Sequence, residues 1–168
     1  MSGKKKVVMI DDEEDLCFVV KSNLEDNGEF EVVTTSNPNE AEDVIRREKP
    51  DVVLLDVVMP ERPGQEIVAA LRNDKELKKT PIIMVSGKGE MIFDKKKNEF
   101  KWLPNNPAAQ NRPDLPDAKG AEALAEAYNA DDYISKPFNT ELLVQVINEL
   151  LEKLSKAKQK DDDDDMMM

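Results

Sequence analysis

The sequence predicts an α/β fold in which a doubly wound, five-stranded parallel sheet carries helices on both faces. Short apolar runs alternate with amphipathic stretches five times along the chain, a rhythm typical of parallel sheets whose strands are joined by helices. The run at 51–55 is apolar after its first residue, as expected of a central strand buried on both faces. A length of 168 residues suits one domain with a substantial core.

The first strand–helix unit begins with KKVVMI at 5–10, which reads as a strand. The apolar residues that follow at helical spacing are Leu16, Val19, Val20 and Leu24. Gly28 comes after this pattern and is predicted to end the helix. FEVVTT at 30–35 is the second predicted strand.

The segment from Asn37 to Glu40 carries a helix-start signal. Asn37 is the predicted N-cap, and Pro38 suits the first helical position because an N–H there would have no partner. Glu40 is predicted to reach back to the N-cap, as in a capping box. This helix is expected to run to Lys49, since Pro50 stops it.

The remaining elements follow the same alternation. The runs at 51–55, 81–85 and 131–135 are the third, fourth and fifth predicted strands. Two helical stripes consist of Ile67, Val68 and Leu71, and of Leu143, Val146, Ile147, Leu150, Leu151 and Leu154. The second stripe is the clearest amphipathic pattern, and its helix is expected to start at an Asn139 cap and to end near residue 158.

One segment breaks the alternation between the fourth and fifth strands. If the fourth helix is GAEALAEAYN at 120–129, the connection from 87 to 119 has 33 residues, far above the common length of about 4–6. Within it, MIFD–KKKN–EFKWL reads as a small hairpin with KKKN as its turn. We therefore predict a single domain at 1–158 with an inserted excursion at about 88–119. Residues 159–168 are predicted to be a disordered acidic tail or a sequence added to the chain.

Five polar residues come at the carboxyl ends of the predicted strands. They are Asp11 and Asp12 after the first strand, Asp56 after the third, Ser86 after the fourth and Lys136 after the fifth. Ligands of such sheets bind outside the carboxyl ends of the strands. We therefore expect all five side chains to face one crevice.

Carboxylates gathered in this way repel one another unless a counter-charge is present. A hard cation with oxygen ligands removes the conflict, and Mg²⁺ commonly binds one or two carboxylates together with waters and a phosphate. A lysine and a hydroxyl opposite the acids complete surroundings suited to a phosphoryl group. Asp56 is the predicted nucleophile, since a carboxylate can carry phosphate as an aspartyl-phosphate.

The acidic run after the first strand allows a second interpretation. Asp11 and Asp12 alone would also suit the start of a helix, where the helix dipole favours negative charge. The same reasoning assigns Glu13, Glu14 and Asp15 to the helix start and to solvent. Two of the five acids are thus expected to belong to a metal and three to the helix.

The composition excludes several classes of site. The chain has no histidine, which rules out Ser-His-Asp and Cys-His nucleophile systems and zinc sites with histidine ligands. Cys17 is the only cysteine, which rules out a disulfide within the chain and suits a reducing cytosol. The net charge of −12 does not favour binding to nucleic acid or to anionic membranes. No apolar stretch approaches the ~20 residues of a membrane span, so a cytoplasmic protein is expected.

Four motifs at the strand ends resemble the response regulator receiver domain. They are DD at 11–12, DVVMP at 56–60, SG at 86–87 and YISKPF at 133–138. The resemblance covers nearly the whole chain except 90–119 and the tail. It implies a flavodoxin-like sheet with strand order 2-1-3-4-5, Mg²⁺ as cofactor, and a role as a phosphoprotein in two-component signal transduction.

The resemblance also implies roles for the acids. Asp56 would accept a phosphoryl group from a phosphohistidine on a histidine kinase or a histidine phosphotransfer protein. Asp12 would bind Mg²⁺ directly, and Asp11 would act largely through water. Asp56 itself and the backbone carbonyl of Val58 would be further ligands of the metal.

Three further residues would respond to the phosphoryl group in such a domain. Ser86 would hydrogen-bond it, Lys136 would pair with it, and Tyr133 would turn inward as Ser86 moves. Taken alone, Ser86 also reads as a plain turn residue and Tyr133 as an ordinary strand aromatic. Pro137 resembles the family's cis-proline after the lysine.

The resemblance places the output partner on the face built from the fourth helix, the fifth strand and the fifth helix. The excursion at 88–119 would reshape this face, so a specialised output protein is expected. Only the tail follows the last helix, which predicts a stand-alone switch that signals by protein contact and is not an enzyme.

Two other functions stay open at this point. A Mg²⁺-dependent phosphohydrolase with an aspartyl nucleophile usually has a second acid two residues later, where this chain has Val58. A phosphorylation-independent, receiver-like adaptor would be expected to lack the acid, lysine or hydroxyl positions, and none of them is missing. The phosphoacceptor switch is therefore the leading prediction.

Overall fold

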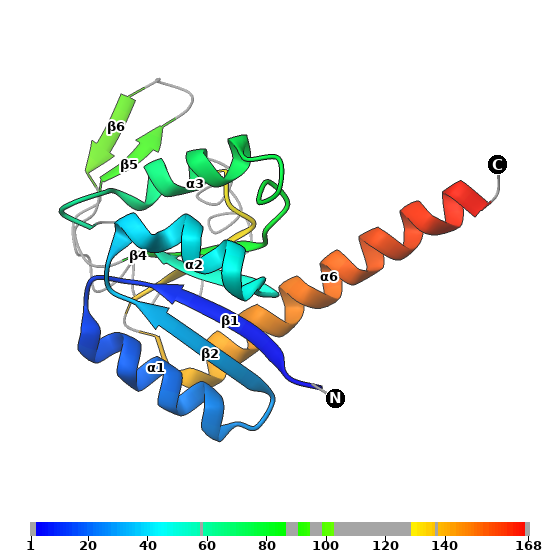
Figure 1. Ribbon diagram of the computed structural model, residues 1–168, viewed down its shortest axis with the longest axis horizontal. Coiled ribbons are helices and arrows are strands. Elements are labelled where there is room, and N and C mark those ends of the chain that lie inside the picture. The colour runs from blue at the N-terminus through cyan, green and yellow to red at the C-terminus, as the bar shows by residue number, and fades with distance from the viewer. Residues whose placement is uncertain are drawn as a thin grey trace.

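Figure 1 shows the computed structural model of the chain, which describes residues 3–57, 59–86, 91–94, 99–102, 129–136 and 138–166. The structure describes the backbone alone, without the side chains, at Ser86, 91–94, 99–102, Ser135 and 159–166. The main sheet is parallel, and its strands are β1 (Lys5–Ile10), β2 (Phe30–Thr35), β3 (Val52–Asp56), β4 (Ile82–Ser86) and β7 (Asp132–Ser135). They lie in the order β2-β1-β3-β4-β7. Because β7 is the fifth strand of this sheet along the chain, the order is 2-1-3-4-5, and the predicted fold class is confirmed.

Helices cover both faces of the sheet, as predicted. They are α1 (Glu14–Asp26), α2 (Ala41–Glu48), α3 (Gly64–Asn73) and α6 (Thr140–Met166), with a 3-10 turn η1 (Pro38–Glu40) before α2. Figure 1 shows α2 and α3 on one side of the sheet, and α1 with the first part of α6 on the other. The buried apolar side chains divide into two clusters accordingly.

Strand β1 illustrates why the sheet needs helices on both faces. Val8 and Ile10 belong to the cluster with α2 and α3, whereas Val7 and Met9 belong to the cluster with α1 and α6, because successive side chains of a strand point to opposite faces. All four are fully buried. Burial of a side chain of this size stabilises the fold by about 1.5–3 kcal/mol.

The outer edge of β2 is covered by side chains from α1. Lys21 Nζ donates to Val32 O at 3.0 Å, and Val32 N donates to Glu25 Oε2 at 3.2 Å. These bonds satisfy backbone groups of Val32 that point away from β1. They also hinder another strand from pairing with this edge.

At the start of the second helical segment, the structure replaces the predicted direct contact of Glu40 with the N-cap by an indirect one. Asn37 is the N-cap as predicted, and its Oδ1 accepts the N–H of Asn39 at 3.0 Å. The Asn37 N–H donates to Thr35 Oγ1 at 3.1 Å, and the Thr35 hydroxyl donates to Glu40 Oε2 at 3.1 Å. Glu40 therefore reaches the N-cap through Thr35, because the end of β2 places that hydroxyl between them. Lys49 ends the segment with a left-handed φ of 48°.

Helix α6 begins as predicted and runs further than predicted. Asn139 Oδ1 accepts the N–H of Leu142 at 2.7 Å, which confirms the cap. The helix continues to Met166, beyond the predicted end near 158. No glycine or proline follows Asn139 to stop it. The assignment of 159–168 to a disordered acidic tail or to a sequence added to the chain stays a prediction. Although α6 has 27 residues, neither it nor any other helix in the described ranges is apolar enough to cross a membrane.

The inserted excursion contains the predicted hairpin. β5 (Met91–Asp94) and β6 (Glu99–Trp102) pair antiparallel, with Met91 opposite Trp102. The turn at 95–98, the rest of the excursion and the predicted fourth helix up to 128 lie outside the described residues. The division into a domain at 1–158 with an excursion at 88–119 stays a prediction.

We expect a chain that ends after Lys158 to keep its stability. Among the residues of α6 whose side chains are described, the apolar stripe packs on the sheet as far as Leu154, so the free energy of unfolding should change by no more than about 0.5 kcal/mol. Urea denaturation followed by far-ultraviolet circular dichroism measures this. A chain that ends before Leu150 is the contrasting control, since it loses a buried leucine and should lose about 2–5 kcal/mol. Equal losses in both chains would contradict this account of α6.

Candidate functional site

The sheet brings the predicted site residues to one edge. Asp11 and Asp12 follow the last residue of β1, Asp56 is the last residue of β3, and Lys136 follows the last residue of β7. The strands are parallel, so their carboxyl ends share this edge, where ligands of such sheets bind.

Three carboxylates meet at this edge and form an acidic pocket. Asp11 and Asp56 are 0% and 3% exposed, whereas Asp12 is exposed. One oxygen of each acid lies within 4.8 Å of the other two. Oδ2 of Asp11 is buried and accepts no hydrogen bond from the described residues. Oxygen donors of this charge and spacing fit a hard divalent cation such as Mg²⁺.

Lys136 supplies positive charge to the acidic pocket. Its Nζ lies 2.9 Å from Asp11 Oδ2 and 3.7 Å from Asp56 Oδ1. The approach to Asp11 is an ion pair and not a directed hydrogen bond. Burial by itself would lower the pKa of Lys136, but the negative charges of Asp56 and Asp11 outweigh it and raise that pKa above its ordinary value. The ammonium is therefore charged throughout the neutral range.

Asp11 is held through both its backbone and its side chain. Its N–H donates to Thr35 O at 3.2 Å, and its carbonyl accepts a hydrogen bond from the Cys17 thiol at 3.3 Å. Its Oδ1 accepts the N–H of Glu13 at 2.9 Å and so supports the turn into α1. One oxygen of Asp11 thus serves the helix start, as the second interpretation predicts, and the other faces Lys136. The role of Asp11 at a metal stays a prediction.

Glu13 is a site residue that the sequence analysis missed. Glu14 and Asp15 lie in the first turn of α1, as predicted. Glu13 precedes that turn, and its Oε2 lies 3.9 Å from Lys136 Nζ although its side chain is 63% exposed. Glu13 is the N-cap of α1 and is mostly exposed, so its assignment to the helix start and to solvent is confirmed. Its approach to Lys136 at the rim of the acidic pocket is an additional contact that the sequence analysis did not predict. Its place directly after Asp12 was the only signal in the sequence.

Gly64 is a second residue that the sequence analysis missed. It is the first residue of α3, and its N–H donates to Val57 O at 2.9 Å. A Cβ at this position would lie 2.1 Å from the carbonyl oxygen of Asp56. The start of α3 can therefore pack against the end of β3 only because no side chain is present.

Arg62 fixes the loop between β3 and α3. Its guanidinium donates to both carboxylate oxygens of Glu42, at 2.6 and 2.8 Å, and to Pro38 O at 3.3 Å. The Arg62 hydrogen bonds hold the pKa of Glu42 below its ordinary value. The loop that follows Asp56 is thereby joined to the start of α2.

The roles of four other predicted site residues cannot be read from the described residues. The backbone of Ser86 ends β4. Tyr133 is half-buried and packs against the apolar cluster under α2 and α3. Val58 and Pro137 lie outside the described residues. The roles assigned to these four residues stay predictions.

A hollow of about 290 Å³ opens beside the acidic pocket. It is lined by Asp12, Ser36, Asn37, Pro38, Met59, Pro60 and Glu61. These residues come from the loops after β1, β2 and β3. Asp12 is the member of the acidic pocket that lines this hollow.

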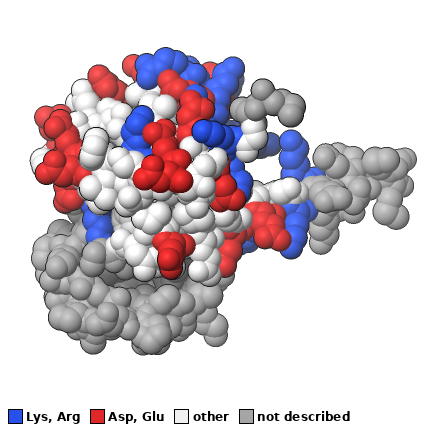
Figure 2. All heavy atoms as spheres, turned by 90° about the horizontal axis from the view of Figure 1, so that it is seen from below, with Lys and Arg blue, Asp and Glu red and all other residues white. Residues whose placement is uncertain are grey.

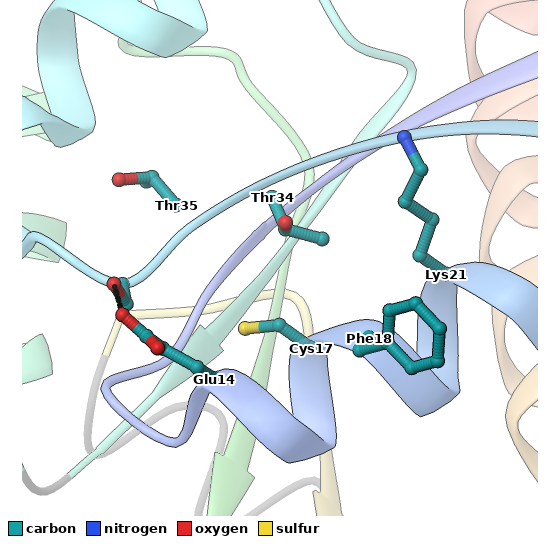
Figure 3. Close-up of a pocket in the computed structure, with 7 residues that line it drawn as sticks. Glu14, Cys17, Phe18, Lys21, Thr34 and Thr35 are labelled. Carbon is teal, nitrogen blue, oxygen red and sulfur yellow. Dashed lines mark hydrogen bonds between the residues drawn. The ribbon is translucent and has the colours of Figure 1, made fainter.

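A second hollow, of about 400 Å³, lies between α1 and β2 (Figure 3). Figure 3 shows Cys17, Phe18 and Lys21 along α1, with Thr34 and Thr35 on the β2 side of this space. Burial, and secondly the charge of Asp11, raises the pKa of Cys17 to about 12. The thiol is therefore protonated and unreactive near neutral pH, and the smaller hollow beside the carboxylates is the candidate site.

One protein family and several solved structures are similar to this chain. The family of the response regulator receiver domain matches residues 7–99, more than half of the chain. Among solved structures, chemotaxis protein CheY4 of Vibrio cholerae is 26% identical with a TM-score of 0.63, over 88% of this chain and 98% of that one. A response regulator receiver domain protein of Clostridium thermocellum is 23% identical with a TM-score of 0.63, over 91% and 98%. The receiver domain of the Francisella response regulator 1452 is 22% identical with a TM-score of 0.59, over 90% and 99%.

Replacing Gly64 with alanine should destabilise the chain by about 1–3 kcal/mol. The added methyl group would meet the Asp56 carbonyl oxygen, so the start of α3 has to move. Chemical denaturation measures the loss. Gly3→Ala is the matched control, because a Cβ there meets nothing within 4 Å. Equal stability of the two variants would show that the approach of α3 to β3 is not tight.

Replacing Glu42 with glutamine should cost about 1 kcal/mol at pH 7, with a smaller difference from the parent in acid. The folded-state pKa of Glu42 is depressed, so its stabilising contribution is present above its ordinary pKa of 4.5. That contribution is lost as pH falls through the lower, folded value. Urea denaturation at pH 7 and pH 3 tests this, with Glu66→Gln as control, since Glu66 is 65% exposed and 3.6 Å from Arg62. A Glu42→Gln loss that does not change with pH would contradict the assignment.

Proposed function

This chain belongs to the response regulator receiver domain family of two-component signalling, and we propose that it is a phosphoacceptor switch in which Asp56 receives a phosphoryl group. One observation supports this best. Asp11, Asp12 and Asp56 meet at one end of the sheet, and Lys136 Nζ lies 3.7 Å from Asp56 Oδ1. A nucleophile, a set of metal ligands and a cation for the phosphoryl oxygens thus share one place.

The proposed transfer begins from a phosphohistidine on a histidine kinase or histidine phosphotransfer protein. A carboxylate oxygen of Asp56 attacks phosphorus, the P–N bond breaks, and its electron pair returns to the imidazole nitrogen. Asp11, Asp12, Asp56 and the Val58 carbonyl would hold Mg²⁺, which neutralises charge on the phosphoryl oxygens. Lys136 pairs with one of these oxygens when it leaves Asp11.

The switch follows from the new phosphoryl group. Ser86 hydrogen-bonds it, and Tyr133 turns inward as Ser86 moves. An output protein recognises the altered packing. It binds the face formed by the fourth helix, β7 and α6 and the excursion at 88–119. In this scheme the chain catalyses only its own phosphorylation and dephosphorylation.

We expect the switch to act in the cytoplasm through proteins, without nucleic-acid or membrane partners. On the face shown in Figure 2, Asp and Glu side chains are interspersed with Lys and Arg. Such a mixed surface, on a chain with a net charge of −12, does not favour contact with a phosphate backbone or an anionic bilayer.

Intact mass spectrometry tests the proposal. We expect the chain to gain the mass of one phosphoryl group after incubation with Mg²⁺ and a small acyl-phosphate donor. Asp56→Asn should gain none, because its amide is not a nucleophile. A chelator should abolish the gain in the parent chain.

The other outcomes separate the alternatives. Modification of both the parent and Asp56→Asn would place the acceptor elsewhere. No gain with Mg²⁺ binding intact would mean that transfer requires a protein donor. No gain and no Mg²⁺ binding would favour the phosphorylation-independent adaptor.

A further inference from the structure

Lys136 contacts Asp11, one of the three acids that could hold a metal ion. Asp11 contributes to the trio of oxygens that lie within 4.8 Å of one another, and its Oδ2 is already 2.9 Å from the Lys136 ammonium. A divalent cation bound to this oxygen would face a second cation at close range. The ammonium therefore has to leave Asp11 Oδ2 when the cation binds.

Two other carboxylates are within reach of the Lys136 ammonium. Asp56 Oδ1 is 3.7 Å away, but Asp56 belongs to the metal-binding trio as well. Glu13 Oε2 is 3.9 Å away and lies outside the trio. The Lys136 side chain is 14% exposed and that of Glu13 is 63% exposed, so Glu13 has the freedom to move toward the ammonium.

We propose that Glu13 is a positioning residue that takes over the Lys136 ammonium when a divalent cation enters the acidic pocket. The exchange keeps Lys136 paired and leaves Asp11 Oδ2 to the cation. It also holds the ammonium at the rim, beside the incoming phosphoryl group. This inference rests on the proposed function, because it requires that the pocket binds Mg²⁺.

A simpler account is that Glu13 attracts cations merely through its charge. The two accounts differ in what they require of Lys136 and of the carboxylate's position. If Glu13 acts through Lys136, its effect must vanish when the ammonium is removed. If it acts only as a distant charge, its effect must persist, and shortening its side chain must change little.

Calorimetric titration of the full-length chain with Mg²⁺ tests the proposal. We expect Glu13→Gln to raise the Kd for Mg²⁺ about fivefold. Lys136→Met should lower the Kd, since the competing cation is gone, and adding Glu13→Gln to it should change the Kd less than about twofold. Asp15→Asn removes the same charge from the same helix start and should change the Kd less than about twofold.

Glu13→Asp provides a test that does not depend on Lys136→Met folding correctly. It keeps the charge and shortens the reach by one methylene group, so we expect it to weaken Mg²⁺ binding nearly as much as Glu13→Gln. A Kd for Mg²⁺ equal to that of the parent would overturn the proposal. The proposal would also fail if Glu13→Gln raised the Kd by the same factor in the parent and in Lys136→Met. Absence of Mg²⁺ binding by the parent would overturn the metal-dependent proposed function and this inference together.

Discussion

The ion pair between Asp11 and Lys136 organises the functional end of this molecule. Two acids, Asp11 and Asp56, are almost completely removed from water, which is unfavourable without a counter-charge. Lys136 reaches them from the end of β7, although β3 and β4 separate that strand from β1 in the sheet. The charge balance therefore depends on the strand order. The ion pair in turn connects the ends of β1 and β7.

The loops around the acids are held by contacts that have no direct part in charge balance. Gly64 lets α3 begin directly against the carbonyl of Asp56, and Arg62 joins the following loop to Glu42 of α2. Thr35 O accepts the N–H of Asp11 from the neighbouring strand. A carboxylate held in this way is preorganised, so little reorganisation is needed when charge develops beside it.

The same balance of charges suits the site to a switch. Asp11 and Asp56 both lie close to the Lys136 ammonium in the described structure, and in the proposed switch a divalent cation would offset the negative charge that remains on the three carboxylates. Lys136 cannot pair with Asp11, Glu13 and a phosphoryl oxygen equally at one time. In the proposed switch each ligand would therefore change the partner of Lys136, and a change of partner at a strand end can be transmitted to the packing around it.

The sequence by itself determined the strands, the order of polar residues at their ends and the helix signals at Gly28, Asn37 and Asn139, because these depend on neighbours a few residues apart. Only the tertiary structure decided which of the five consecutive acids face Lys136, since Glu13 follows β1 and Lys136 follows β7, two strands that β3 and β4 separate in the sheet. It also decided the need for glycine at 64, which comes from the approach of Asp56 O. The tertiary structure also decided that the Thr35 hydroxyl bridges Asn37 N and Glu40 Oε2. The distance between a strand end and the next helix start depends on how both pack on the sheet.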